Sequence, residues 1–308
     1  MNAAPVTTTR ASHVSRILVI ALHAFTQLVR MKVFYFLAVF GIILIAANFL
    51  KLPQHEGPES AGANVLHLIK SWCMGPMHLF SVVLSIVATA LLLPKDVEDR
   101  TLYTILAKPV PRFDYLAGKL LGVMMLIFVS LALMDLLMTV VLHLRTGAIL
   151  AEQLELAKSM GYSAADMESM KQEASVQGST WSLQGAVFAM FLRASIMASI
   201  ALLISTFSSS TLFTTIVSFL IYFIGHFQAD ARDAFLSSGE AGQGLFGRMV
   251  TLVVSLVFPD FQIFNVIDAV IEGQTLPLWI VGKLTLVALY YAVFFTIASW
   301  FIFAEKEF

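Results

Sequence analysis

The sequence predicts an all-α membrane protein that crosses the bilayer several times. Hydrophobic residues make up 58% of its 308 positions and charged residues only 13%, whereas a soluble domain carries roughly twice that charged fraction. The apolar residues also form long runs that approach or exceed the roughly 20 residues a helix needs to cross a bilayer. Polar segments separate these runs. Together these observations predict a single transmembrane domain over residues 1–308, with the lipid bilayer as its surroundings.

The first predicted element is an amphipathic helix at residues 12–30. Its apolar residues can share one face, while Arg16, His23, Gln27 and Arg30 lie elsewhere. A helix of this kind lies along a membrane surface with its apolar face in the lipid. The alternative is that these residues extend the first span into the cytoplasm.

Six segments are predicted to span the membrane. They are residues 33–50, 76–93, 115–142, 183–204, 212–227 and 278–303. Lys and Arg outnumber Asp and Glu in the segments on the N-terminal side of the membrane, and basic residues favour the cytoplasmic side. With six spans, this bias predicts that both termini are cytoplasmic.

A dense segment of mixed charge at residues 94–113 lies between the second and third predicted spans. Residues 96–106 can form a short helix with Leu102 on its apolar side. Pro109 and Pro111 end this helix, because proline cannot continue a helix and restricts the residue before it. Such a helix at the membrane surface suits contact with a soluble partner. The alternative is a solvated connector that contacts no partner.

The polar segment at residues 143–181 is predicted to be a helical hairpin outside the membrane. Glu152, Glu155 and Lys158 suggest its first helix. Ser163, followed three residues later by Asp166, is typical of the start of a second helix.

Residues 246–273 predict a re-entrant hairpin before the last span. Residues 249–258 are apolar but too few to cross the membrane. We expect two short half-helices that enter from one face, with a bend at Pro259. The alternative is a seventh span, which would bury Asp260 in the membrane at a cost of roughly 3 kcal/mol or more.

Two charged residues fall inside predicted spans. Asp135 lies in the third span and Arg193 in the fourth, at depths that allow them to pair. Charged groups in lipid are costly unless they are matched. The two residues are therefore candidates either for a polar point on a transport path or for a structural ion pair.

The sequence contains no residue set that predicts an enzyme. It has no Gly-x-x-x-x-Gly-Lys-Ser/Thr run, the loop that holds nucleotide phosphates. The seven histidines show no spacing typical of metal ligands, so no catalytic, cofactor-binding or metal site is expected in this chain. The single cysteine excludes an internal disulfide, and no basic surface predicts nucleic-acid binding.

The charged segment resembles the cytoplasmic loop of ABC-2-type permeases, the membrane subunits of one class of ATP-binding-cassette exporters. Glu98, Thr101-Leu102, Pro109, Arg112 and Gly118-Lys119 match the pattern of that loop in order and spacing. Arg100 departs from it, because glycine is more usual there. The predicted layout of spans is also similar.

The resemblance implies that residues 94–113 form a coupling helix in a groove of a separate ATPase subunit, which would bind ATP and Mg²⁺. It also implies that a second permease copy or a sister permease completes the path, that transport is export, and that the membrane is a bacterial-type inner membrane. The residues expected to contact the ATPase are Asp96, Glu98, Arg100, Thr101, Leu102, Pro109 and Arg112.

Two other functions remain open at this stage. One is a secondary transporter or channel that does not use ATP, although such carriers usually place more ionisable groups in their spans. The other is a membrane scaffold whose outer hairpin recruits a partner. No residue pattern selects a transported substrate.

Overall fold

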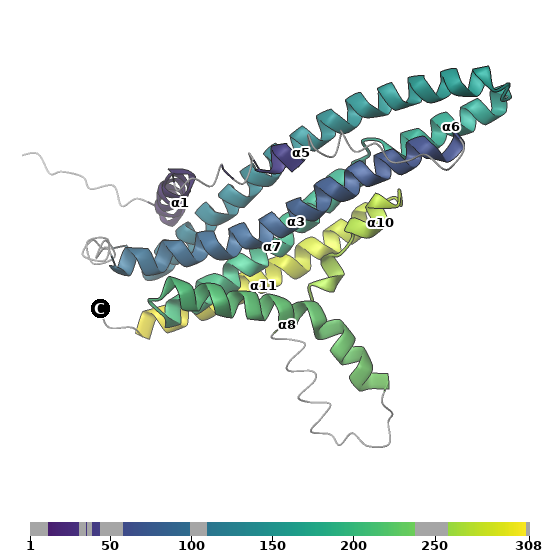
Figure 1. The fold of residues 1–308 in the computed structure, drawn as a ribbon. Helices are drawn as coiled ribbons and strands as arrows, with labels where there is room; N and C mark the ends of the chain where they lie inside the picture. Colours follow the sequence, from purple (N-terminus) through teal and green to yellow (C-terminus); the bar gives the residue numbers. More distant parts are fainter. Residues whose placement is uncertain are drawn as a thin grey trace, which may run out of the picture.

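The computed structural model describes residues 12–30, 35, 39–43, 58–98, 110–237 and 258–305, and all regular structure within them is helical. Figure 1 shows long helices running side by side, with short helical pieces at one end. The elements in chain order are α1 (His13–Arg30), α3 (Pro58–Glu98), α5 (Arg112–Ser159), α6 (Ala164–Gln177), α7 (Trp181–Phe207), α8 (Thr211–Ser237), η1 (Gln262–Phe264), α10 (Ile267–Ile271) and α11 (Leu278–Glu305).

Among the described residues, five helices are long and apolar enough to cross a membrane: α3, α5, α7, α8 and α11. The chain is therefore a multi-pass membrane protein, as its composition predicts. These helices contain five of the six predicted spans, and the first predicted span, 33–50, lies mostly outside the described residues. Helix α3 begins at Pro58, whereas the predicted span begins at residue 76. Pro76 does not start the helix but lies inside it. Polar turns extend these helices beyond the apolar windows from which the spans are predicted.

Helix α7 occupies the centre of the bundle. In its most apolar stretch 83% of residues are buried, compared with 22% in α8. It contacts α3, α5, α8 and α11, and many of its buried residues are alanine or serine. Small side chains let helices approach closely in membranes, which explains why this sequence lies inside the bundle.

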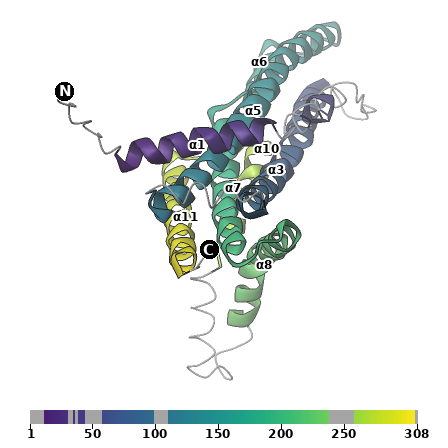
Figure 2. The same cartoon turned by 90° about the vertical axis from the view of Figure 1, so that its left-hand side faces the viewer.

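Helix α1 begins one residue after the predicted start, ends at the predicted residue and lies across the long helices, as Figure 2 shows. It crosses α5 at Gly118 and Gly122, a small-xxx-small pair of the kind that allows close helix contact. A Cβ atom on Gly118 would lie 2.7 Å from the Cβ of Ile20, and one on Gly122 would lie 2.7 Å from the Cβ of Ala24. Both glycines are therefore needed for this crossing.

The predicted outer hairpin differs from the structure in its first helix. Residues 143–159 do not form a separate loop helix, because α5 continues without a break to Ser159. The start of the second helix is confirmed: Ser163 caps α6 and exchanges reciprocal hydrogen bonds with Asp166. A turn at Gly161, with φ of +81°, reverses the chain so that α6 packs against α5.

The prediction of a half-helix after Pro259 is wrong. Residues 249–257 lie outside the described residues, and from Pro259 onward the chain forms two short pieces, η1 and α10. The Asp260 carboxylate accepts a hydrogen bond from the backbone N–H of Gln262 (2.9 Å). Such local side-chain bonds offer the backbone an alternative to helix, and here they interrupt the expected half-helix.

Candidate functional site

The first two turns of α5, residues Arg112 to Lys119, join three other helices, and we call them the α5 junction. The contact with α3 is a buried ion pair. The Lys119 ammonium lies 2.6 Å from the Asp96 carboxylate, and the Tyr115 hydroxyl donates a hydrogen bond to the same carboxylate. Asp96 is 6% exposed and Lys119 is 2% exposed, so neither charge is solvated and each depends on the other.

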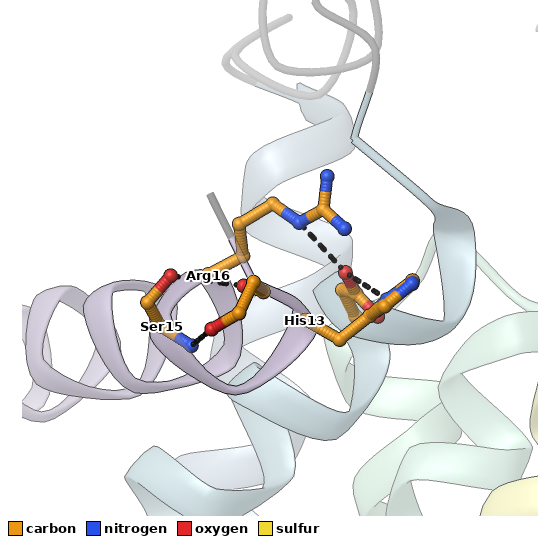
Figure 3. A network of polar contacts seen from close by, with 5 residues as sticks. His13, Ser15 and Arg16 are labelled. Atoms are coloured by element: carbon orange, nitrogen blue, oxygen red, sulfur yellow. Dashed lines mark hydrogen bonds and ion pairs between the residues drawn. The ribbon is translucent and has the colours of Figure 1, made fainter. Parts of the chain in front are cut away.

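The contact with α1 depends on Asp114, which is buried. His13 Nδ1 lies 3.0 Å from one of its carboxylate oxygens, and Arg16 Nε lies 3.1 Å from the other. Figure 3 shows His13 and Arg16 pointing from the start of α1 to this carboxylate. At the same end of α1, the Ser12 hydroxyl accepts a hydrogen bond from the N–H of Ser15.

The contact with α11 is made by Arg112. Its guanidinium donates to the backbone carbonyls of Phe303 (2.8 Å) and Ala304 (2.6 Å). These carbonyls belong to the last turn of α11 that the structure describes, and a positive charge is favourable at the C-terminal end of a helix. The Tyr115 ring also stacks on that of Phe303, with centroids 6.1 Å apart.

These contacts place the predicted coupling residues in two groups. Asp96 and Arg112 have side chains that bond to α5 and α11 within the chain. Glu98 is the last residue of α3, and its side chain lies outside the described part, as do Arg100, Thr101, Leu102 and Pro109. The predicted separate helix from residue 96 is also altered, because α3 continues through Pro94 and includes Asp96.

The sequence did not predict the polar cluster that joins α1, α3 and α5 within the protein. The members of this cluster that were not singled out are His13, Arg16, Asp114 and Tyr115. A signal for them was present, because ionisable residues in the first turns of an apolar helix need partners from neighbouring segments.

Arg193 does not pair with Asp135, and that predicted ion pair is wrong. The Arg193 guanidinium lies 2.6 Å from His78 Nε2 and donates to the Phe261 carbonyl at 2.8 Å. Asp135 lies beside Gln184, Phe188 and Phe191 of α7. Residues two apart on a helix do not share a face, so Arg193 points away from the side of α7 that Phe191 presents to α5.

Arg193 instead holds the irregular chain after Pro259. The Phe261 N–H bonds to the Gly225 carbonyl of α8 (3.1 Å). A Cβ on Gly225 would lie 2.7 Å from the Pro259 carbonyl oxygen, so only glycine allows this approach. Non-helical backbone at membrane depth must be satisfied by protein groups, and Arg193 supplies one such donor.

A second buried cation acts on the same segment. Lys70 of α3 is 1% exposed and donates to the Val270 carbonyl in α10 at 3.4 Å. Two cations from different helices thus bond to the backbone on either side of the break between η1 and α10. The sequence did not indicate Lys70, because a lysine near the end of an apolar run is usually taken as an interfacial residue.

Among the described residues, no group of three or more His, Cys, Asp or Glu side chains could hold a metal ion. The polar clusters of the α5 junction and of Arg193 consist of ion pairs and of hydrogen bonds to side chains and backbone. Their geometry positions helices relative to one another.

Comparison with known proteins identifies the family. A family model described as ABC-2 family transporter protein matches residues 18–303. No curated protein matches the chain significantly. The match includes α5 with its junction, the Arg193 cluster and the segment after Pro259. The chain therefore belongs to the ABC-2 family of transporter proteins and is an ABC transporter permease, a membrane component of transport that is not itself catalytic.

Proposed function

We propose that this chain is the membrane half of an exporter driven by separate ATPase subunits, which bind ATP and Mg²⁺. The ATPase contacts residues 94–113, with Glu98, Arg100, Thr101, Leu102 and Pro109 as the contact surface. Two permease halves, either identical or sister chains, form the translocation path in a bacterial-type inner membrane. The family membership supports this proposal.

The observation that carries the proposal is the α5 junction. Helix α3, which carries Asp96 in its last turn, ends at Glu98, and α5 begins at Arg112 on the other side of the 99–109 segment. Asp96 and Lys119 join these two helices by a buried ion pair. A displacement of the segment therefore moves α3 and α5 together.

The junction also extends the displacement to α1 and α11. Asp114 holds the start of α1, and Arg112 holds the end of α11. Asp96 and Arg112 thus act as positioning residues behind the contact surface. The ends of α1 and α11 that lie nearest the chain termini meet at this one site, which supports placing both termini on the ATPase side of the membrane.

The segment after Pro259 is the second moving part of the proposal. Arg193 and Lys70 fix its backbone to α7 and α3, so a shift between these helices changes its position. We place this segment at the outer end of the path, where it opens during export.

Co-purification from the native membrane tests the ATPase contact. An ATPase subunit is expected with the wild-type tagged chain and is expected to be lost with Glu98→Lys. The matched control is Glu168→Lys, which reverses a carboxylate on α6, far along the chain from residues 94–113. Absence of an ATPase from the wild-type sample, or equal recovery with Glu98→Lys, would contradict the proposal.

A further inference from the structure

A small pocket between α5 and α7 is not used by the coupling mechanism. It has a volume of about 210 Å³, and its wall includes Asp135, Gln184 and the rings of Phe128, Phe188 and Phe191. The remaining wall is aliphatic. The pocket lies in the part of both helices that is apolar enough to cross the membrane.

The pocket contains an acidic side chain that no described cation pairs with. Asp135 Oδ1 is buried without a hydrogen-bond partner, and no ion pair to Asp135 exists among the described residues. Gln184 lies beside Asp135 in the pocket wall, and its amide donates to the Thr139 hydroxyl at 3.3 Å. Arg193 is bonded to His78 and Phe261. A carboxylate at this depth is costly without a counter-charge.

The aromatic residues around Asp135 favour an organic cation. The Phe128 and Phe191 rings meet edge to face at 5.6 Å, and Phe188 lies 6.0 Å from Phe191. The faces of such rings attract ammonium groups. A hard metal ion is disfavoured, because Mg²⁺ and Ca²⁺ need about six or more oxygen ligands and the wall supplies only those of Asp135 and Gln184 as side-chain groups.

The size of the pocket limits how much of a ligand it holds. Pockets that enclose a whole drug-sized molecule measure roughly 300–1,000 Å³, which is more than this one. Phe128 is 54% exposed, and Leu136, the next residue after Asp135, is 60% exposed. A ligand with its charged head at Asp135 can therefore place an apolar tail along this exposed face of α5.

We propose that the Asp135 pocket binds the ammonium head of an amphipathic organic cation. Gln184 orients the carboxylate, the three phenylalanine rings surround the head, and the outer face of α5 receives the tail. That the ligand is also a transported substrate rests on the proposed transport function. Its binding to the pocket does not rest on that function. Asp135 is then a specificity-determining residue for a cationic, apolar cargo.

Equilibrium binding to the full chain in a non-ionic maltoside detergent tests the proposal. The probe is labelled hexyltrimethylammonium, and hexanesulfonate is the control with the same tail and an anionic head. Saturable binding of the cation alone is expected for the wild type. Asp135→Asn keeps the side-chain shape and removes the charge, so we expect roughly tenfold to hundredfold weaker binding. Glu168→Gln, which neutralises an exposed carboxylate on α6, is expected to bind as the wild type does.

A second variant covers the case in which Asp135→Asn does not fold. Phe191→Leu keeps the carboxylate and an apolar side chain, and we expect binding to weaken by roughly threefold to thirtyfold. No saturable cation binding by the wild type, or equal binding by the wild type and a folded variant, would overturn the proposal. This assay needs no ATPase, so its result is independent of the co-purification experiment.

Discussion

The buried ion pair between Asp96 and Lys119 gives a prediction whose size follows from the structure. In Lys119→Met, the Asp96 carboxylate stays buried and loses its counter-charge. Breaking a buried pair by removing one partner costs about 3–5 kcal/mol. In Asp96→Leu, the Lys119 ammonium is left in the same position and the Tyr115 hydroxyl loses its acceptor, which adds about 1–3 kcal/mol.

The double variant, which combines Lys119→Met with Asp96→Leu, separates the contribution of charge pairing to stability from that of side-chain packing. If the two effects were independent, the losses in unfolding free energy would add to about 7–13 kcal/mol. Replacing both charges with apolar groups of similar volume leaves neither charge unpaired, so we expect a loss of only about 1–3 kcal/mol, mainly from Tyr115. The expected coupling energy is therefore at least about 4 kcal/mol.

Denaturant-induced unfolding in detergent micelles, followed by helical circular dichroism, measures these differences. Lys171→Met is the control, because Lys171 forms an exposed pair with Glu168 at 3.1 Å and exposed pairs contribute less than about 1 kcal/mol. Additive effects of the two junction variants, or a loss for Lys119→Met no larger than that for the control, would refute the reasoning that this pair joins α3 to α5.

Three further predictions concern other contacts. Gly122→Leu is expected to separate α1 from α5 and to lower the free energy of unfolding by about 1–3 kcal/mol. The measurement is the rate of proteolysis within α1, which is expected to rise. The control is Gly147→Leu, at a position with open space, which is expected to leave this proteolysis rate unchanged. Arg193→Met leaves the Phe261 carbonyl without its donor (2.8 Å in the wild type), so faster hydrogen exchange is expected after residue 258, and an unchanged rate would contradict this role. Ser163→Ala removes the cap of α6 and is expected to cost about 1 kcal/mol, measured as increased exchange confined to the first turn of α6.

The sequence predicted the elements that depend on composition and local signals. Five of the predicted spans lie within helices of the structure, because the part of a helix that crosses the lipid must be apolar. The α6 cap was predictable because a capping box involves residues only three apart. The ABC-2 resemblance, based on residues 98–119, is confirmed by the family match over residues 18–303.

The sequence could not predict how the helices are rotated about their axes. The depth of a residue in the membrane follows from its position along a helix, and Asp135 and Arg193 have depths that suit pairing. The direction in which each side chain points depends instead on how the helices pack. Likewise, Asp96 and Arg112 were predicted only as surface residues that contact a partner protein. Their side chains instead bond to residues of α5 and α11 that are distant in sequence, so these contacts could not be predicted from the sequence. The broken form of residues 259–271 depends on donors such as Lys70 and Arg193 that come from other helices.

The length of α5 has a mechanical consequence. It is one uninterrupted helix of 48 residues without proline, and at 1.5 Å per residue it is roughly 72 Å long, which exceeds the roughly 40–45 Å thickness of a whole bilayer. A rod of this length amplifies rotation: a tilt of about 5° at its first turn displaces its last turn by roughly 6 Å. A spectroscopic label on α6 would therefore report a tilt that begins at the first turn of α5. Under the coupling proposed above, a protein bound to α6 would sense the nucleotide cycle without contacting the ATPase.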